Sequence, residues 1–273
     1  MGTEPSFSRQ KDKSQKSSFR SFWDETGESI PAFYGAPSTK YYFECERTLF
    51  ESFFPDLKGK KVFKTDLWDE AKNTQILKWA AEQGAEVYGL DISYPVVKDA
   101  RDLFRQSSLK CGIIVSDLRQ IAYGDESFDY IYSMGTIEHF KEYRQALGEI
   151  YRVLKKGGRA IIGVPNKWDP FLRPMMVAFL YRLKLYGYGY EKSFSMRQLE
   201  RMLRNVGFEI LERSGILFMP GSLRMLDLFV HVNWPKASFI MAPLIRPFAS
   251  LYRTFPLLRR HGYLIASVVQ KPG

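Results

Sequence analysis

The sequence predicts a doubly wound α/β fold with a mostly parallel sheet. From Lys60 to Asn166, short apolar runs alternate with helical segments, which is the pattern of strand–helix–strand units with right-handed crossovers. Acidic residues follow two successive predicted strands, at the edge where such sheets bind ligands. Of the 273 residues, 45% are hydrophobic and 15% aromatic, which is enough to bury a sizeable core.

Each element is predicted from a local signal. Gly84 ends one helix, Pro95 suits the first turn of another, and Gly157 and Gly158 follow a third that ends in lysines. The predicted strands are 60–68, 85–93, 111–118, 128–135, 159–166 and 262–270. The predicted helices are 73–84, 95–108 and 143–158, and a helix followed by a strand is predicted over 195–215.

Two acids stand at the ends of consecutive predicted strands. A carboxylate at Asp91 can accept hydrogen bonds from both hydroxyls of a ribose, or it can serve as an acid at the start of the next helix. A carboxylate at Asp117 can accept from an exocyclic amine such as that of adenine, or it can bond to its own backbone in a turn. Their joint placement favours a ligand site over two separate structural roles.

Four stretches carry a family resemblance: GLDIS, the SDL turn, SFDYIYSMGTIEHF and EIYRVLKKGGRAIIGVPN, in this order over residues 62–166. Together they resemble the class I S-adenosylmethionine-dependent methyltransferases of the small-molecule, type 11-like group. The resemblance implies a Rossmann-like, mostly parallel seven-stranded sheet and S-adenosylmethionine as cofactor. The positions that it assigns to the cofactor are Asp91 for the ribose, Asp117 for adenine, and Met134 and Gly135 for the methionine end. The neighbouring Ile92 and Leu118 are also predicted to bind the cofactor.

The first loop departs from the family pattern. Members usually have an acid and a glycine-rich turn, approximately DxGxG, whereas VFKTDLWDEAKNT contains no glycine. Glycine permits positive φ and close backbone approach, so this loop is expected to follow a different path around the cofactor's methionine moiety. Asp66 or Glu70 is predicted to bind the cofactor's amino group, and Thr65, Lys64 or Trp68 to shape the pocket.

His139 is the predicted catalytic residue. The resemblance places the histidine of the TIEHF turn near the mouth of the active site. Methyl transfer is an in-line displacement in which positioning supplies much of the catalysis, but a hydroxyl acceptor also needs a base. Capping or packing at the start of the next helix is the alternative role for this side chain.

The chain is predicted to divide into a disordered basic tail (1–18), a helical N-terminal cap (19–58) and the methyltransferase domain (59–273). Two helical insertions, 167–192 and 222–261, combine apolar and basic residues, a composition shared by interfacial helices and by buried caps. We expect them to lie side by side and cover the acceptor. The side chains expected to line an apolar pocket there are Phe171, Met175, Phe179, Tyr186, Phe239, Phe248 and Tyr252.

The net charge of +10 and the pI of about 9.4 favour anionic partners such as an acidic membrane, or simply a basic face. Base-reading groups are not evident, so no nucleic acid is expected. The two cysteines, Cys45 and Cys111, indicate neither a disulfide framework nor a metal site. Without a signal peptide or spanning run, the expected location is cytoplasmic, with peripheral membrane contact as a further option.

The expected function is S-adenosylmethionine-dependent methyl transfer to a small or lipid-linked acceptor. The alternative is a catalytically inactive methyltransferase-like module that acts as a membrane-associated scaffold, which the glycine-free loop would favour. A nicotinamide-dependent dehydrogenase is disfavoured because no GxGxxG follows the first strand. The acceptor and the oligomeric state are left open.

Overall fold

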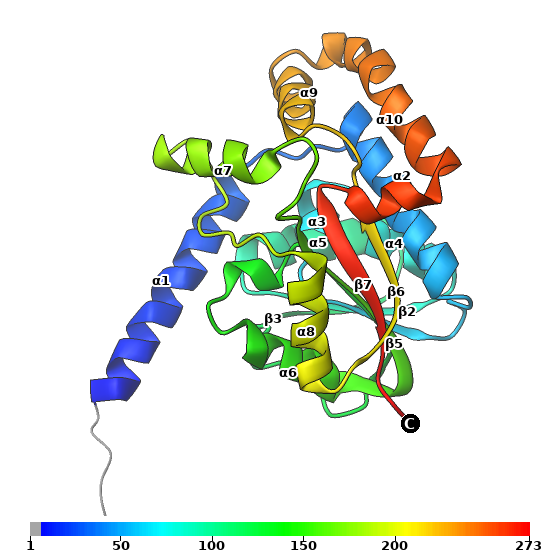
Figure 1. The fold of residues 1–273 in the computed structure, drawn as a ribbon. Coiled ribbons are helices and arrows are strands. Elements are labelled where there is room, and N and C mark those ends of the chain that lie inside the picture. The colour runs from blue at the N-terminus through cyan, green and yellow to red at the C-terminus, as the bar shows by residue number, and fades with distance from the viewer. Residues whose placement is uncertain (1–6) are drawn as a thin grey trace, which may run out of the picture.

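The structure, a computed structural model, describes residues 7–273 and contains a twisted seven-stranded sheet flanked by helices (Figure 1). The strands are β1 (Lys61–Lys64), β2 (Glu86–Asp91), β3 (Cys111–Val115), β4 (Phe128–Met134), β5 (Leu154–Pro165), β6 (Glu209–Ile216) and β7 (Leu264–Gln270). They are arranged in the order β3-β2-β1-β4-β5-β7-β6, and β7 is antiparallel to both neighbours. The predicted doubly wound, mostly parallel seven-stranded fold is confirmed.

The strand order reverses between β1 and β4, which are hydrogen-bonded neighbours although β2 and β3 intervene in the chain. Ligands of doubly wound folds bind at the carboxyl edge beside such a reversal. The residues that follow β1, β2 and β4 therefore meet at one place. This geometry, rather than any single motif, positions the site.

Two apolar layers hold the helices against the sheet. One layer contains α2 (Pro37–Phe53), α4 (Ile76–Glu82) and α5 (Tyr94–Gln106), and the other contains α6 (Tyr143–Val153) and α8 (Met196–Val206). Pro95 occupies the first turn of α5, as the sequence predicts, and the side chain of Ser93 caps the helix. Ser195 and Gln198 form a capping box at the start of α8, which ends at Gly207 with a φ of +112°.

The N-terminal region begins with a helix where the structure describes it. Of the predicted disordered tail, residues 1–6 lie outside the described residues, but residues 7–18 form the first half of the helix α1 (Phe7–Ser29). Lysine, glutamine and arginine are good helix formers, and neither glycine nor proline interrupts the segment before Gly27. Beyond Ser18, α1 packs against α5, where Tyr94 N donates to Asp24 Oδ1 at 2.8 Å.

Element boundaries in two segments also differ from the sequence-based prediction. β1 ends at Lys64, because residues after Leu67 form a short helix, α3 (Trp68–Lys72), that was not predicted. The helix predicted over 143–158 ends at Val153, because residues 154–158 enter β5. The amide of Gly157, whose φ is +70°, donates to the carbonyl of Lys271 at 2.8 Å, so tertiary pairing overrides the lysine–glycine signal.

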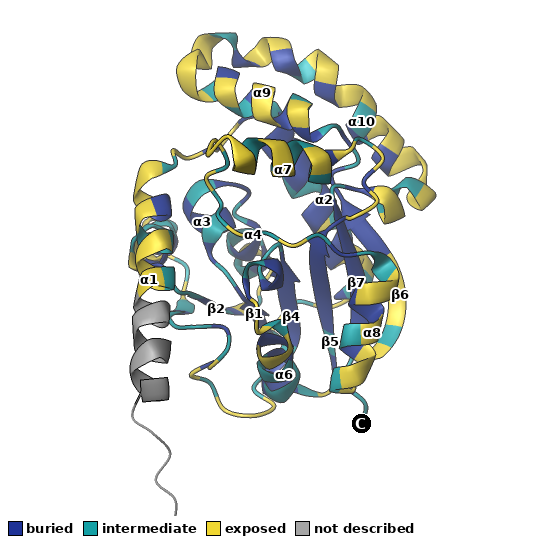
Figure 2. Cartoon of the chain, turned by 60° about the vertical axis from the view of Figure 1, so that its left-hand side comes forward, coloured by how far each residue is buried: buried dark blue, intermediate teal, exposed yellow. Residues whose placement is uncertain are grey.

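The two insertions lie together at one end of the molecule, as Figures 1 and 2 show. The first contains α7 (Arg173–Arg182), and the second contains α9 (Gly221–Asn233), η2 (Pro235–Met241), α10 (Ala242–Thr254) and η3 (Pro256–His261). α7 packs against α9, and Phe171 lies edge-on to Phe248 with ring centroids 5.9 Å apart. The expected side-by-side arrangement is therefore present.

Candidate active site

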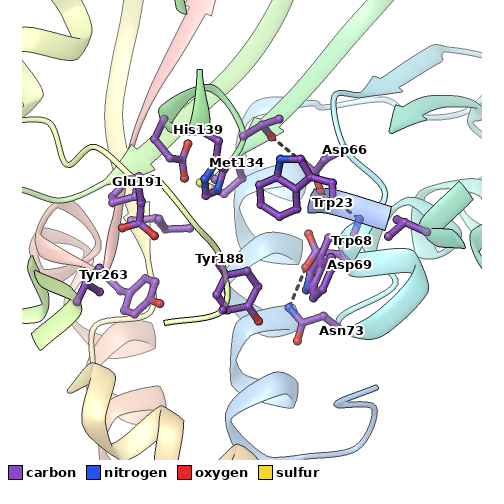
Figure 3. Close-up of a pocket in the computed structure, with 18 of the residues that line it drawn as sticks. Trp23, Asp66, Trp68, Asp69, Asn73, Met134, His139, Tyr188, Glu191 and Tyr263 are labelled. Atoms are coloured by element: carbon purple, nitrogen blue, oxygen red, sulfur yellow. Dashed lines mark hydrogen bonds between the residues drawn. The ribbon is translucent and has the colours of Figure 1, made fainter. Parts of the chain in front are cut away.

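A cavity of about 310 Å³ opens at the carboxyl ends of β1, β2 and β4. Its walls come from three sources: the strand ends, the helix α1 and the two insertions (Figure 3). The predicted site residues that line it are Thr65, Asp66, Asp91, Ile92, Leu118, Met134, Gly135 and His139. Trp68, which was expected to shape the pocket, also lines it. A volume of this size is typical of small-molecule sites.

Asp91 is held by two backbone amides. Its Oδ2 accepts from Leu67 N at 3.0 Å, and its Oδ1 accepts from Ser93 N at 2.9 Å. Each oxygen keeps a second lone pair, so the carboxylate can still accept from a ligand's hydroxyls. Burial raises the pKa of Asp91 to about 6. The Leu67 contact also ties the loop after β1 to the end of β2.

Two predicted cofactor residues do not line the cavity. Asp117 forms an ion pair with Arg119, whose Nη2 lies 2.7 Å from Oδ2, and only its neighbours Ser116 and Leu118 reach the cavity wall. Glu70 is fully buried in α3, and its Oε1 accepts from Leu77 N at 2.8 Å. Arg119 therefore occupies the carboxylate of Asp117, and Glu70 faces the core, where its Oε2 lies 3.3 Å from Lys64 Nζ.

A buried lysine organises the glycine-free loop. Lys64, the last residue of β1, has no exposed surface, and its Nζ lies 3.0 Å from Asp66, 2.9 Å from Asp69 and 3.3 Å from Glu70. Burial opposes its charge, but these carboxylates outweigh burial and raise the pKa of Lys64. The residues after β1 therefore fold around a buried cation. Their ion pairs with Lys64 hold the backbone of this loop, which contains no glycine.

The loop is also joined to the segment after β4. Asp66 Oδ2 accepts from Thr136 Oγ1 at 2.7 Å, and Thr65 Oγ1 donates to Ser133 Oγ at 2.8 Å. Gly135 has a φ of +76°, a conformation that favours glycine. These contacts fix the floor of the cavity.

Electrostatics make the floor acidic. The side chains of Asp66, Asp69 and Asp91 line the cavity together with Glu138, which is buried and has one carboxylate oxygen without a hydrogen-bond partner in the described structure. Burial raises the pKa of Glu138 well above its ordinary value. The three aspartates suit a ligand that carries positive charge, and S-adenosylmethionine carries an ammonium and a sulfonium.

His139 has one defined hydrogen bond. Its Nδ1 lies 2.8 Å from the carbonyl oxygen of Tyr190. Because a carbonyl can only accept, Nδ1 carries the proton and Nε2 keeps a basic lone pair. Burial lowers the pKa of His139, and the ring of Trp23 packs edge-on against it at 4.9 Å. The neutral imidazole thus has the form that a general base requires.

A buried ion pair supports the wall on the acceptor side. Arg173, at the start of α7, binds Glu191 with 2.9 Å between Nη2 and Oε2, and its guanidinium stacks over the ring of Tyr263 at 4.0 Å. Tyr186 also donates to Glu191. Although burial opposes it, the Arg173 guanidinium lowers the pKa of Glu191. This cluster fixes the first insertion against the sheet.

Several lining residues were not identified from the sequence. They are Phe19 and Trp23 of α1, Asp69 and Asn73 of the first loop, and Glu138, Arg173, Tyr188, Glu191, Arg224 and Tyr263. Their places in the lining depend on packing between segments, which the local sequence pattern does not specify.

The expected apolar pocket needs correction. Met175, Phe179 and Phe239 are exposed on the surface rather than directed into the cavity, and Tyr252 is buried in the core. Of the seven side chains predicted to line it, Tyr186 alone belongs to the lining. The helices turn their larger apolar side chains outward, and helical periodicity by itself does not say which side faces the domain.

The strand order and the position of the cavity at the strand reversal agree with the class I methyltransferase fold that the sequence resembles. Residues 71–162 match the family model described as a methyltransferase domain. The chain is 34% identical to a demethylmenaquinone methyltransferase of Thermus thermophilus over 79 residues, which are 29% of this chain and 36% of that protein. It is 27% identical to a sterol 24-C-methyltransferase of Kluyveromyces lactis over 138 residues, 49% of this chain and 37% of that protein.

The chain thus spans little more than a third of the length of these curated relatives. Among solved structures, it resembles phosphoethanolamine N-methyltransferase 2 of Haemonchus contortus in complex with phosphomonomethylethanolamine and S-adenosylhomocysteine. The TM-score is 0.61 at 17% identity, with 93% of this chain and 60% of that chain covered. At this identity the likeness shows the fold. The resemblance to class I methyltransferases predicted from the sequence is confirmed.

Proposed function

We propose that this protein binds S-adenosylmethionine and transfers its methyl group to a small or lipid-linked acceptor. The observation that carries the proposal is the meeting of Asp91, Asp66 and Gly135 around one cavity beside the strand reversal. Asp91 would hold the ribose hydroxyls, and Asp66 would face the ammonium of the methionine end. Asp69, which lines the cavity, is a further acceptor for that ammonium. It takes the role that the sequence analysis gave to Glu70.

The cofactor supplies an electrophilic methyl group, and the protein's residues supply position and charge. The floor holds the cofactor through carboxylates, while His139 and Tyr188 line the same cavity from the side of the first insertion. His139 Nε2 is available to accept a proton from an acceptor hydroxyl. The two curated relatives are named for demethylmenaquinone and for a sterol, which supports an acceptor with a large apolar part.

Calorimetric titration with S-adenosylmethionine and S-adenosylhomocysteine tests the proposal. We expect saturable binding of both ligands, weakened by about 1.5–3 kcal/mol in Asp91→Ala, the range for a hydrogen bond to a charged group. Asp117→Ala is the matched control, because its carboxylate is paired with Arg119 outside the cavity. Absence of binding to both ligands would instead favour the catalytically inactive scaffold.

A further inference from the structure

The exposed apolar side chains are concentrated on the two insertions. Of the twenty-three large hydrophobic residues that are exposed in the described structure, nineteen lie in residues 167–192 and 222–261, although these segments are a minority of the chain. Phe239 and Trp168 are each 72% exposed. We call the exposed surface of residues 167–192 and 222–261 the insertion face; Figure 2 shows their helices α7, α9 and α10 exposed together at one end of the molecule.

Charge on the insertion face has one sign. Residues 170–190 contain no acid, and the single acid of residues 222–261 is Asp227, which is fully buried and accepts from Ser38 N at 2.8 Å. Exposed cations stand among the apolar side chains at Arg182, Lys184, Lys236, Arg246 and Arg253. A surface that combines apolar groups with cations, and presents no anion, complements an anionic lipid headgroup layer.

The cavity opens at this face. Leu185 is 69% exposed and Met225 is 44% exposed, and both also line the cavity. Met176 of α7 and Leu228 of α9 continue the apolar lining inward. An apolar path therefore runs from the exposed surface to the wall that carries His139. A lipid could pass along this path without exposing its acyl chain to water.

The geometry points to docking of the insertion face on an anionic lipid bilayer, with the cavity mouth against the membrane and a membrane lipid as acceptor. The second half of this inference rests on the proposed methyl transfer, whereas docking does not. No helix among the described residues is long and apolar enough to cross a membrane, so the contact would lie in the interfacial plane. A second copy of the chain is a poorer occupant, because two such faces would bring like charges together.

Co-sedimentation with vesicles tests the docking. We expect the full chain to bind vesicles of phosphatidylcholine and phosphatidylglycerol, to bind phosphatidylcholine alone much more weakly, and to be released by high salt. Arg182→Ser with Lys236→Ser should lower the partition coefficient about twenty-five-fold, roughly fivefold for each cation near the surface. Lys98→Ser with Lys110→Ser, exposed cations outside the insertions, should leave it unchanged.

Tryptophan fluorescence shows which face enters the lipid. The chain has five tryptophans, of which Trp168 and Trp234 are the exposed ones on the insertion face. Vesicles with brominated acyl chains should quench the wild-type protein, and the double variant Trp168→Phe, Trp234→Phe should lose that quenching while still sedimenting.

Three outcomes would overturn the inference: no sedimentation of the wild type with anionic vesicles, an equal loss in the control variant, or quenching that persists without Trp168 and Trp234. The chain could instead form an oligomer without lipid. If Phe179→Ser and Phe239→Ser dissociate that oligomer, the insertion face binds a second copy of the chain. Calorimetry with S-adenosylmethionine on the same variants separates the proposals, because we expect its affinity to be unchanged. If the protein docks on vesicles but does not bind the cofactor, the proposal of methyl transfer fails and the proposal of docking stands.

Discussion

The ammonium of Lys64 lies 2.9 Å from the carboxylate of Asp69, inside a loop that contains no glycine. Lys64 ends β1, and Asp69 belongs to the short helix that follows it. A buried cation is stable only with compensating charges, and this one has three carboxylates. The ion cluster thus determines the path of the backbone beside the cavity, in a loop where the class I methyltransferases that the sequence resembles usually have glycines.

Replacement of the central cation should destabilise the fold. In Lys64→Met, buried carboxylates would lose their partner, and we expect the free energy of unfolding to fall by about 3–5 kcal/mol. Urea denaturation measures this change. Lys78→Met is the matched control, because Lys78 and Glu82 form a pair on the surface of α4 that should contribute less than about 0.5 kcal/mol. Equal losses in the two variants would contradict a central role for Lys64.

Cofactor affinity should depend on the protonation of Asp91. Burial raises its pKa to about 6, so the carboxylate is ionised at neutral pH and gains a proton as the pH falls through that value. The ionised form is the better acceptor for ribose hydroxyls, so the affinity should decrease below about pH 6, by up to tenfold per pH unit. Calorimetry at several pH values should show this decline in the wild type and a flat, weaker profile in Asp91→Asn. Parallel profiles for the two proteins would exclude Asp91 as the titrating group.

The first helix should contribute to cofactor binding through its aromatic side chains. Phe19 and Trp23 line the cavity, and the guanidinium carbon of Arg119 lies 5.5 Å from the centroid of the Phe19 ring. Trp23→Ala should weaken binding of S-adenosylhomocysteine by about 1 kcal/mol, since an aromatic contact in a cavity contributes this much. Trp168→Ala serves as the control, because Trp168 is exposed and does not line the cavity. If both variants bind alike, α1 does not act as a wall of the site.

The imidazole of His139 should be neutral in slightly acidic solution. Burial lowers its pKa, and its bond to the Tyr190 carbonyl places the proton on Nδ1. The chain has three histidines, so His231→Asn with His261→Asn leaves a single imidazole for long-range nitrogen–proton spectroscopy. We expect a titration midpoint below the ordinary value of about 6.5 and an Nδ1–H tautomer. A midpoint at or above that value, or a proton on Nε2, would argue against a base.

The sequence by itself determined the parts of the site that belong to strand ends. Asp91, Met134 and Gly135 follow apolar runs, and in a parallel sheet the carboxyl ends of such runs share one edge. Knowledge of each strand is then enough to place its terminal residues. The same reasoning placed Asp117 at that edge, but it could not foresee that Arg119, two residues later, would bind its carboxylate.

Tertiary structure decided the remainder. Asp69 and Glu70 are adjacent in sequence, and only the turn of α3 directs the first toward the cavity and the second into the core. Trp23, Arg173 and Arg224 reach the cavity from segments far apart in the chain. Local patterns specify which residues share a face of a helix or strand, because side-chain direction repeats every few residues along the element. Which element that face meets depends on long-range packing, and this packing brought α1 and both insertions to the cavity.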